Sequence, residues 1–315
     1  MTTIRQPLHP LDRAVMVGMR TMVASMKGSV TGPEARKPFD ELMEATPAAP
    51  GVTYELASVG GIAGVWCRPA NTSDAAAAIL YFHGGAYIVG SARAYQHFVG
   101  QIVARTQIAA FVPEYGLAPE RPFPAAVADA RAAYAGLVAQ GFTRIALVGD
   151  SAGGGLALSL LSLAVAKARD GVSLGPVGAV AMSPWTDLTL TGDSMETRAE
   201  ADPLLTKEAL ATTAHLYLGR NDRRDPRVSP LYADLAGLPP IRIHVGEDEV
   251  LLDDSTRYAD QVEKSGGVCQ VNVWEGMVHV FPSSVSTLRA AKAALDDIGD
   301  FLRQCFKVET SVRSS

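Results

Sequence analysis

The chain has 315 residues, enough for one large domain or for a domain with a smaller appendage. Hydrophobic residues make up 48% of the chain and charged residues 19%, which is the composition of a folded protein and excludes a largely disordered one. The formal net charge of -5, the pI near 5.7 and the lack of any Lys/Arg cluster argue against a nucleic-acid partner.

The three cysteines, Cys67, Cys269 and Cys305, are far apart in the sequence, and no CxxC motif occurs. We therefore expect reduced, mostly buried thiols rather than a disulfide framework or a cysteine-based zinc site. The N-terminus lacks the pattern of a signal peptide, and the most apolar run, residues 156–168, is too short and too rich in serine for a membrane span. These features predict a cytoplasmic protein without stable membrane insertion.

The N-terminal segment contains an apolar-striped helix candidate at 12–28 and ends in a proline-rich linker. From about residue 52, short β-branched or aromatic runs alternate with longer helical patterns, which predicts a mostly parallel sheet covered by helices on both faces. The expected strands are 52–59, 62–69, 77–83, 108–115, 144–150, 177–184, 241–247 and 269–276. The expected helices include 92–106, 125–141, 153–171 and 255–267.

Two connections depart from this alternation. Only a short glycine turn joins the first two strands, so we expect an antiparallel hairpin at that edge. The connection from Met182 to Ile241 is far longer than the roughly 2–6 residues usual in such folds, and it contains a helix candidate at 205–219. We therefore predict three parts: a cap segment at 1–48, an α/β domain at 49–185 and 231–315, and a cap insertion at 186–230.

A G-x-S-x-G motif, Gly149 to Gly153, lies where an expected strand passes into an expected helix. In that context the glycines permit a sharp turn that exposes the Ser151 hydroxyl, and the helix start places the Ala152 N–H beside it. A serine N-cap in a glycine-rich turn is the alternative interpretation. A phosphate loop is disfavoured because no Gly-Lys-Ser/Thr follows.

A serine hydroxyl is a weak nucleophile and needs a positioned base. Three histidines follow Ser151 in the chain, at positions 215, 244 and 279. His215 lies in the expected insertion helix, and His244 lies inside an apolar strand, where a core histidine is the better interpretation. His279 follows the last expected strand in a loop, where a general base is expected.

A carboxylate must orient the base and stabilise its charged form. The loop after the 241–247 strand offers Glu247, Asp248 and Glu249, and the residues alone leave all three open. At the end of the third expected strand, His83 is followed by Gly84 and Gly85, the pattern of an oxyanion loop. Without side chains, the N–H groups of these glycines could approach a developing oxyanion, and the Ala152 N–H would complete the hole. A two-glycine turn is the alternative.

Together these motifs resemble the hormone-sensitive-lipase-like branch of the α/β-hydrolases, bacterial carboxylesterases with HGG and GDSAGG motifs. The resemblance covers roughly residues 50–305. It rests on YFHGGAYIVGS, EYGLAPERPFPAAVADA, GDSAGGGLAL, SPWTDLT, DPLLT, GLPPIRIHVGEDEVLLDDS and GMVHVF, in this order. It implies an α/β-hydrolase fold with a mostly parallel eight-stranded sheet, flanking helices and a helical cap.

The resemblance assigns Ser151 as nucleophile, His279 as base and Glu249 as acid, with Gly84, Gly85 and Ala152 as the oxyanion donors. Many relatives carry Asp at the acid position, so the extra methylene of Glu249 requires a different loop path. A second departure is Gly116, where the family usually has Arg, which puts a structural ion pair from that position in doubt.

The implied activity is hydrolysis of short- to medium-chain acyl esters, small-molecule substrates that need no metal or organic cofactor. The same triad would serve a lactone hydrolase, a deacetylase or an amidase. A non-catalytic ligand receptor on this scaffold is the rival from another class, and His279 argues against it. The last strand, 269–276, is a candidate exposed edge through which two chains could pair as a homodimer.

Overall fold

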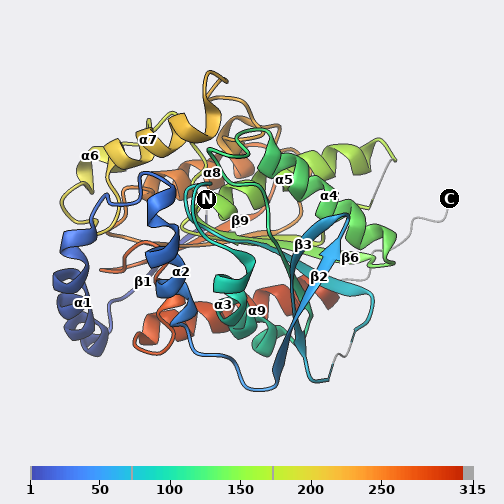
Figure 1. The fold of residues 1–315 in the computed structure, drawn as a ribbon, viewed down its shortest axis with the longest axis horizontal. Coiled ribbons are helices and arrows are strands. Elements are labelled where there is room, and N and C mark those ends of the chain that lie inside the picture. The colour runs from blue at the N-terminus through green and yellow to red at the C-terminus, as the bar shows by residue number, and fades with distance from the viewer. Residues whose placement is uncertain (1, 72–73, 172–173, 308–315) are drawn as a thin grey trace.

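The computed structural model describes residues 2–71, 74–171 and 174–307. Its centre is a nine-stranded sheet in the order β1-β9-β8-β7-β6-β4-β5-β3-β2. The pairs that involve β3 are antiparallel, and all other neighbouring strands are parallel. Helices α3 and α9 cover one face of the sheet, and α4, α5 and α8 cover the other (Figure 1).

The strands are β1 (Thr2–Gln6), β2 (Val52–Val59), β3 (Ile62–Pro69), β4 (Ala77–Phe82), β5 (Ala110–Pro113), β6 (Arg144–Asp150), β7 (Gly178–Met182), β8 (Ile241–Gly246) and β9 (Cys269–Trp274). The α-helices are α1 (Pro10–Val23), α2 (Arg36–Glu44), α3 (Ala92–Thr106), α4 (Ala125–Ala139), α5 (Ser151–Arg169), α6 (Ser194–Thr197), α7 (Lys207–Leu218), α8 (Leu252–Lys264) and α9 (Arg289–Lys307). The eight strands expected from the sequence are therefore all present as β2 to β9.

The expected hairpin is confirmed. Strands β2 and β3 pair antiparallel along their whole length, from Val52 opposite Pro69 to Val59 opposite Ile62. Gly60 and Gly61 both have positive φ, 61° and 80°, as a tight two-residue hairpin turn requires.

The sheet has nine strands rather than the eight that the family resemblance implied. The extra strand is β1, which pairs in parallel with β9 from Thr2 opposite Gln270 to Gln6 opposite Trp274. The prediction of β9 as an exposed edge is therefore wrong, because the hydrogen-bonding groups on that side of β9 are taken by the chain's own N-terminus. The homodimer predicted through this edge loses its structural basis.

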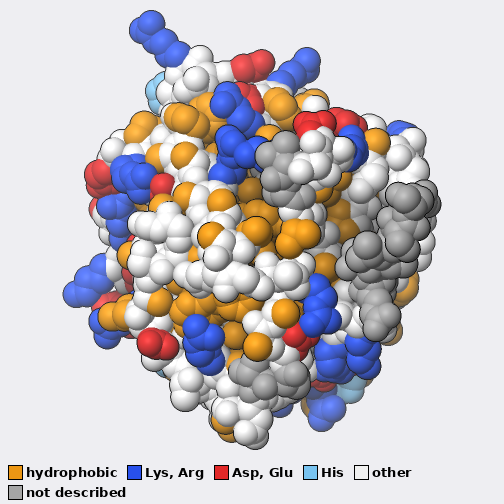
Figure 2. All heavy atoms as spheres, turned by 90° about the vertical axis from the view of Figure 1, so that its right-hand side faces the viewer, with side chains coloured by type: hydrophobic (Ala, Val, Ile, Leu, Met, Phe, Trp, Pro, Cys, Tyr) orange, Lys and Arg blue, Asp and Glu red, His pale blue; other side chains and the backbone are white. Residues whose placement is uncertain are grey.

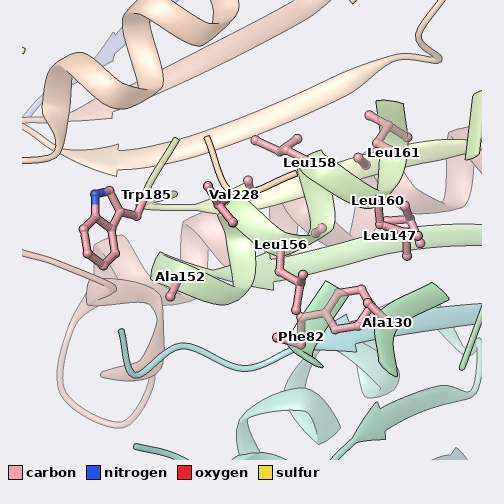
Figure 3. Close-up of a cluster of buried hydrophobic side chains, with 14 of the residues drawn as sticks. Phe82, Ala130, Leu147, Ala152, Leu156, Leu158, Leu160, Leu161, Trp185 and Val228 are labelled. Atoms are coloured by element: carbon pink, nitrogen blue, oxygen red, sulfur yellow. The ribbon is translucent and has the colours of Figure 1, made fainter. Parts of the chain in front are cut away.

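The central strands are buried on both faces, so their side chains alternate between two cores. In β4, Leu80 and Phe82 belong to the core under α4 and α5, whereas Ile79 and Tyr81 belong to the core under α3 and α9. Figure 3 shows leucines of α5 in the same cluster as Phe82. By length and composition α5 is the only described helix that could cross a membrane, and 67% of its apolar window is buried inside the protein.

The N-terminal segment and the 186–230 insertion lie against each other at one end of the molecule (Figure 1). The Gly28 N–H donates to the Leu204 carbonyl at 2.8 Å, and the Lys27 ammonium donates to the Ala199 carbonyl at 2.6 Å. The buried Asp12 carboxylate of α1 accepts the N–H groups of Arg289 and Ala290, the first two residues of α9. The first residues of this segment also belong to the sheet as β1.

The ion pair that an Arg at position 116 would form is made here by Arg121, which binds Asp129. The guanidinium of Arg121 binds both carboxylate oxygens of Asp129, at 2.7 and 2.9 Å, and the Gly116 N–H donates to the same carboxylate. A Cβ on residue 116 would lie 2.9 Å from the Arg121 guanidinium. Arg121 therefore fills the space that a side chain at 116 would occupy, and it supplies the charge.

Apolar side chains gather in a hollow between α4 and α5, on the face shown in Figure 2. The hollow holds about 260 Å³ and is lined by Tyr134, Val138, Leu160 and Leu163, among others. At 1.5 Å per helical residue, Leu160 lies about 14 Å along α5 from the helix start. This hollow is therefore separate from the site at the N-terminus of α5.

Candidate active site

Three of the predicted site residues meet in one hydrogen-bonded chain. His279 Nε2 lies 2.9 Å from Ser151 Oγ, and His279 Nδ1 lies 2.8 Å from Glu249 Oε2. A carboxylate only accepts hydrogen bonds, so Nδ1 carries the imidazole proton and Nε2 presents its lone pair to the serine hydroxyl. The side chain of His279 is 10% exposed and that of Glu249 is fully buried.

The turn at Ser151 forms because its glycines allow two backbone segments to touch. Ser151 has φ of 53°, in the left-handed region, directly after β6 and at the first residue of α5. A Cβ on Gly149 would lie 2.3 Å from the Gly153 carbonyl oxygen, and a Cβ on Gly153 would lie 2.2 Å from the Phe82 and His83 carbonyl oxygens. Glycine at both positions therefore lets the strained serine turn close against the end of β4.

The acid loop gives each of its three carboxylates a different partner. Glu247 pairs with Arg5 of β1 at 2.8 Å, and Asp248 pairs with Arg20 of α1. Glu249 alone of the three contacts His279. The geometry thus separates the alternatives that the residues left open, and it brings together the acid, base and nucleophile that the family resemblance indicated.

The Glu249 carboxylate is held by two donors besides His279. Its Oε1 accepts the Ser183 hydroxyl at 2.7 Å and the Gly246 N–H at 2.5 Å. The next residue, Val250, donates its N–H to the Asp202 carboxylate, in the long segment between β7 and β8, at 3.0 Å. Neither Ser183 nor Asp202 was predicted as a site residue, although both lie in motifs that carry the family resemblance, SPWTDLT and DPLLT.

The environment of His279 favours its charged form. Burial alone would lower the pKa of His279, but the hydrogen bond and the charge of Glu249 outweigh it and raise the pKa above the usual value of 6.5. The more distant charges of Asp202 and Asp150 act in the same direction. Glu249 thereby stabilises the imidazolium that a base in this position would become.

The loop after β4, which carries Gly84 and Gly85, is tied to the buried carboxylate of Asp150, next to Ser151. Asp150 accepts the hydroxyls of Tyr81 at 2.6 Å and Tyr95 at 3.0 Å, together with the Gly84 N–H at 3.0 Å. Burial raises the pKa of Asp150 to about 6 although these hydrogen bonds favour its charged form. The N–H of Gly84, one of the three predicted oxyanion donors, is thus already engaged in the structure.

His83 packs against the same loop and lies outside the hydrogen-bonded chain of Ser151, His279 and Glu249. It is fully buried, its ring stacks on Tyr115 with centroids 4.3 Å apart, and its Nδ1 lies 2.7 Å from the Gly84 carbonyl oxygen. Burial lowers the pKa of His83 to about 4, so the ring is neutral near pH 7. Its position therefore fixes the path of the loop that carries the glycines.

The other candidate histidines lie outside the triad. His244 is the core histidine expected from its strand: it is fully buried, its Nδ1 accepts the Trp274 indole N–H and its Nε2 faces Asp297 at 3.0 Å. His215 is exposed on α7. Among the described residues, no group of three or more His, Cys, Asp or Glu side chains is arranged to hold a metal ion.

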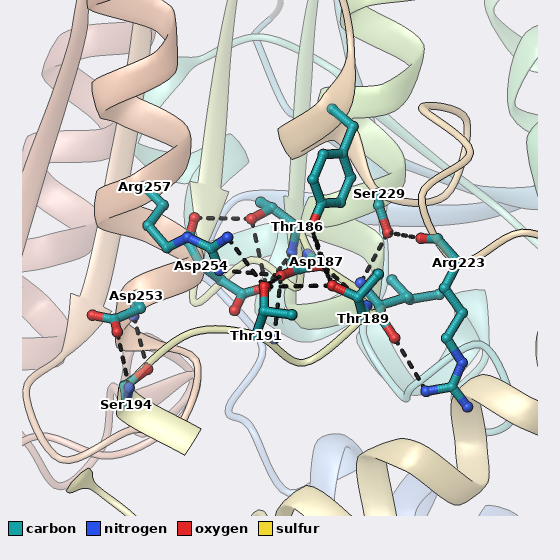
Figure 4. A network of polar contacts seen from close by, with 12 residues as sticks. Thr186, Asp187, Thr189, Thr191, Ser194, Arg223, Ser229, Asp253, Asp254 and Arg257 are labelled. Atoms are coloured by element: carbon teal, nitrogen blue, oxygen red, sulfur yellow. Dashed lines mark hydrogen bonds and ion pairs between the residues drawn. The ribbon is translucent and has the colours of Figure 1, made fainter. Parts of the chain in front are cut away.

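A polar network fixes the segment that follows β7 (Figure 4). The fully buried Asp254 carboxylate accepts the Thr186 N–H at 2.7 Å and the Asp187 N–H at 2.8 Å. Asp187 in turn accepts the hydroxyls of two threonines and pairs with Arg257 at 3.1 Å. This network anchors the chain immediately after Ser183.

Comparisons with known proteins identify the fold family and the class of enzyme. The family model of the α/β hydrolase fold matches residues 79–283. An acetyl-hydrolase of Streptomyces hygroscopicus is 38% identical, covering 79% of this chain and 82% of its own. An esterase of Acinetobacter venetianus is 36% identical, covering 85% and 88%.

The fold is also similar to that of a solved esterase from the bacterial hormone-sensitive lipase family. That structure has a TM-score of 0.84 at 36% identity and covers 93% of this chain and 97% of its own. The family match, the relatives and the structural neighbour agree in fold and in class. The chain therefore belongs to the α/β-hydrolase fold family, in its hormone-sensitive-lipase-like branch, and is a carboxylic ester hydrolase.

Proposed function

We propose that this protein is a serine carboxylesterase that hydrolyses short- to medium-chain acyl esters through an acyl-enzyme intermediate. The observation that carries the proposal is the continuous hydrogen-bonded chain from Ser151 through His279 to Glu249, with contacts of 2.9 and 2.8 Å. These are the contacts that a nucleophile, its base and the orienting acid need before any substrate binds.

In the first half of the reaction, His279 Nε2 takes the Ser151 proton while Oγ attacks the ester carbonyl. The imidazolium that forms is stabilised by the Glu249 carboxylate, which stays charged. His279 then gives its proton to the alcohol oxygen, the ester C–O bond breaks and the acyl group remains on Ser151. In the second half, His279 takes a proton from water, the hydroxide attacks the acyl carbon, and Ser151 recovers its proton as the acid leaves.

The oxyanion would be held by backbone N–H groups at the start of α5 and in the loop after β4. Gly84 is excluded from our assignment because its N–H donates to Asp150. The N–H groups of Gly85, Ala86 and Ala152 donate no hydrogen bond to any part of the chain that the structure describes. We assign these three as the donors, so Ala86 replaces Gly84 in the set expected from the sequence. Losing one such donor typically costs about 10²–10³ in kcat.

The names of two relatives support ester substrates, and one of them supports a small acyl group. One relative is called an acetyl-hydrolase and another an esterase. Lactones, amides and acetyl groups on larger molecules present the same carbonyl to the same triad. The cap decides among them, and we propose that it consists of the N-terminal segment and the 186–230 insertion.

We also propose a cytoplasmic site of action. Cys67, Cys269 and Cys305 are free and buried, as the sequence predicted. Free thiols at all three positions suit a reducing compartment, where they remain unpaired.

The Ser151→Ala variant tests the proposal. Hydrolysis of p-nitrophenyl butyrate should fall by several orders of magnitude, because the Ser151 hydroxyl is the group that lies 2.9 Å from His279 Nε2. Ser162→Ala is the matched control: its hydroxyl donates within α5 to the Leu158 carbonyl, so activity should be unchanged. A Ser151→Ala variant with wild-type activity would reject the mechanism. A screen over acyl length, alcohol size, lactones and acetamides would then rank the substrate classes.

A further inference from the structure

The turn after β7, residues 183–185, lies beside two strands whose carboxyl ends lead to triad residues. In the sheet β7 pairs on one side with β6, which ends at the nucleophile, and on the other with β8, which leads into the acid loop. Because the carboxyl ends of parallel strands meet at one edge of the sheet, this turn is placed between Ser151 and Glu249.

The turn makes a direct contact with the loop of each triad residue. The Trp185 N–H donates to the carbonyl of Ser151 at 2.9 Å. The Ser183 hydroxyl donates to Glu249 Oε1 at 2.7 Å and accepts the N–H of Val280, the neighbour of His279, at 3.0 Å. The segment that follows is itself anchored by the Asp254 network (Figure 4).

The hydrogen bonds of Ser183 leave its hydroxyl little freedom. A hydroxyl has one proton to donate, and Glu249, which cannot donate as a carboxylate, takes it. The Val280 N–H can only donate, so it must point at the Ser183 oxygen. Ser183 is fully buried, so no bulk solvent competes for either partner. One oxygen atom thus sets both the orientation of the acid and the position of the backbone beside the base.

The backbone at both ends of the Ser183–Val280 hydrogen bond is strained. Ser183 has φ of 47° and Val280 has φ of 51°, and neither residue is glycine. For a β-branched residue such as valine this region is a genuine outlier. Such strain persists where surrounding contacts over-determine it, and it clusters at functional sites.

We propose that Ser183 is a positioning residue for ester hydrolysis: its hydroxyl holds the Glu249 carboxylate and the backbone next to His279 in one fixed arrangement. The inference rests on the proposed triad mechanism. Ser183 does not contact Ser151 Oγ, and it acts through Glu249 and His279.

Removing the hydroxyl should slow the chemical step without weakening substrate binding. Glu249 would lose one of the two donors on Oε1, and the buried Val280 N–H would lose its acceptor. Both losses loosen the Glu249–His279 contact that orients the base. We therefore expect kcat to fall by about 10- to 100-fold, the factor that corresponds to a hydrogen bond to a charged group, while KM changes little.

Substitutions at position 183 separate the role of the hydroxyl from that of the backbone. Ser183→Gly removes the hydroxyl but suits the left-handed backbone, so it should be folded and at least as stable as Ser183→Ala. Ser183→Cys retains a weak donor and acceptor and should recover part of kcat. Ser159→Ala is the control, since this buried serine on α5 donates only to the Pro226 carbonyl.

The readouts are kcat and KM for p-nitrophenyl butyrate, the pH profile of kcat/KM, and the rate at which an organophosphonate labels Ser151. For Ser183→Gly we expect slow turnover, slow labelling, a melting temperature no lower than that of Ser183→Ala and an acid limb shifted to lower pH. The shift follows because a looser Glu249 contact stabilises the imidazolium less, which lowers the pKa of His279.

Turnover and labelling of Ser183→Gly within about twofold of wild type would overturn the positioning role and leave the triad mechanism intact. A fall in melting temperature with unchanged kcat would assign Ser183 a purely structural role and would also overturn it. If the wild-type protein itself neither hydrolyses the ester nor reacts with the phosphonate, the proposed function fails as well, so the two failures are distinguishable.

Discussion

Replacing Glu249 by glutamine should disable the base while leaving the fold intact. The Glu249 side chain is fully buried and receives donors on both oxygens: His279 on Oε2, and Ser183 with Gly246 on Oε1. An amide has one acceptor oxygen and one NH₂ group, so one side must present a donor to a donor. When the NH₂ faces His279, the imidazole adopts the tautomer with its proton on Nε2, and it cannot accept from Ser151.

The expected loss of kcat is large for Glu249→Gln and small for the neighbouring Asp248→Asn. The wrong tautomer in a serine–histidine–acid triad costs about 10⁴ in kcat, and we expect a loss of that order for Glu249→Gln. Asp248→Asn only removes an ion pair whose side chains are 22% and 30% exposed. Such a pair is worth at most about 1 kcal/mol, so even its complete transfer to the barrier would change kcat by about fivefold.

A third variant measures the reach of the acid. Glu249→Asp withdraws the carboxylate by one methylene, about 1.5 Å, and the 2.8 Å contact to His279 would no longer be a hydrogen bond. A displacement of this size costs about 10² in rate, which places this variant between the other two. The assay is kcat for p-nitrophenyl butyrate, with circular dichroism and melting temperature to establish folding. An Asp248→Asn variant slower than Glu249→Gln, with both folded, would refute the assignment of Glu249.

Two further predictions concern pH and the ion pair near Gly116. Only neutral His279 can accept the serine proton, and the pKa of His279 is raised, so the acid limb of kcat/KM should have its midpoint above pH 6.5. In Glu249→Gln the midpoint should move to lower pH. A wild-type midpoint below pH 6.5 would contradict this prediction. Gly116→Arg should lower the free energy of unfolding by about 1 kcal/mol, because the new side chain competes with Arg121 for Asp129, and Arg121→Ala in the same chain should restore most of it. Urea denaturation of the double variant would contradict the prediction if the two losses simply added.

The parts of the site that the sequence predicted are those carried by local motifs. Ser151 is recognised from residues on either side of it, and His279 from its place after the last strand. The choice among Glu247, Asp248 and Glu249 is different, because it depends on Arg5 and Arg20, which lie at the other end of the chain. No local sequence pattern predicts that these arginines pair with Glu247 and Asp248, so from the residues alone the three carboxylates are equivalent candidates for the acid.

The sequence indicates two further features near the site only weakly: the role of Ser183 and the partner of the Gly84 N–H. Ser183 directly follows a buried strand that neighbours the nucleophile strand, so the meeting of strand ends at one sheet edge could have identified it. That signal requires the strand order, which the sequence alone does not provide. Similarly, paired glycines indicate a close backbone approach at residues 84 and 85, but not that Asp150 takes the Gly84 N–H.

The extra strand illustrates why the sheet was predicted one strand short. Strand β1 consists of TTIRQ, five residues of which only Ile4 is a large hydrophobic one, and it lies at the sheet edge with most side chains exposed. It lacks the alternation or the apolar run that predicts a strand. Backbone pairing with β9 and the Arg5–Glu247 contact hold it, and both depend on tertiary structure.

Trapping the acyl-enzyme shows whether Ser151 is the nucleophile. The protein is mixed with p-nitrophenyl acetate, quenched in acid during turnover and digested. The masses of the peptides are then measured by mass spectrometry. If Ser151 is the nucleophile, one acetyl group is found on the peptide that contains Ser151, located on that serine, and none is found in Ser151→Ala. Ester cleavage at an undiminished rate in Ser151→Ala, or an acetyl group carried by another residue on the reaction path, would contradict it.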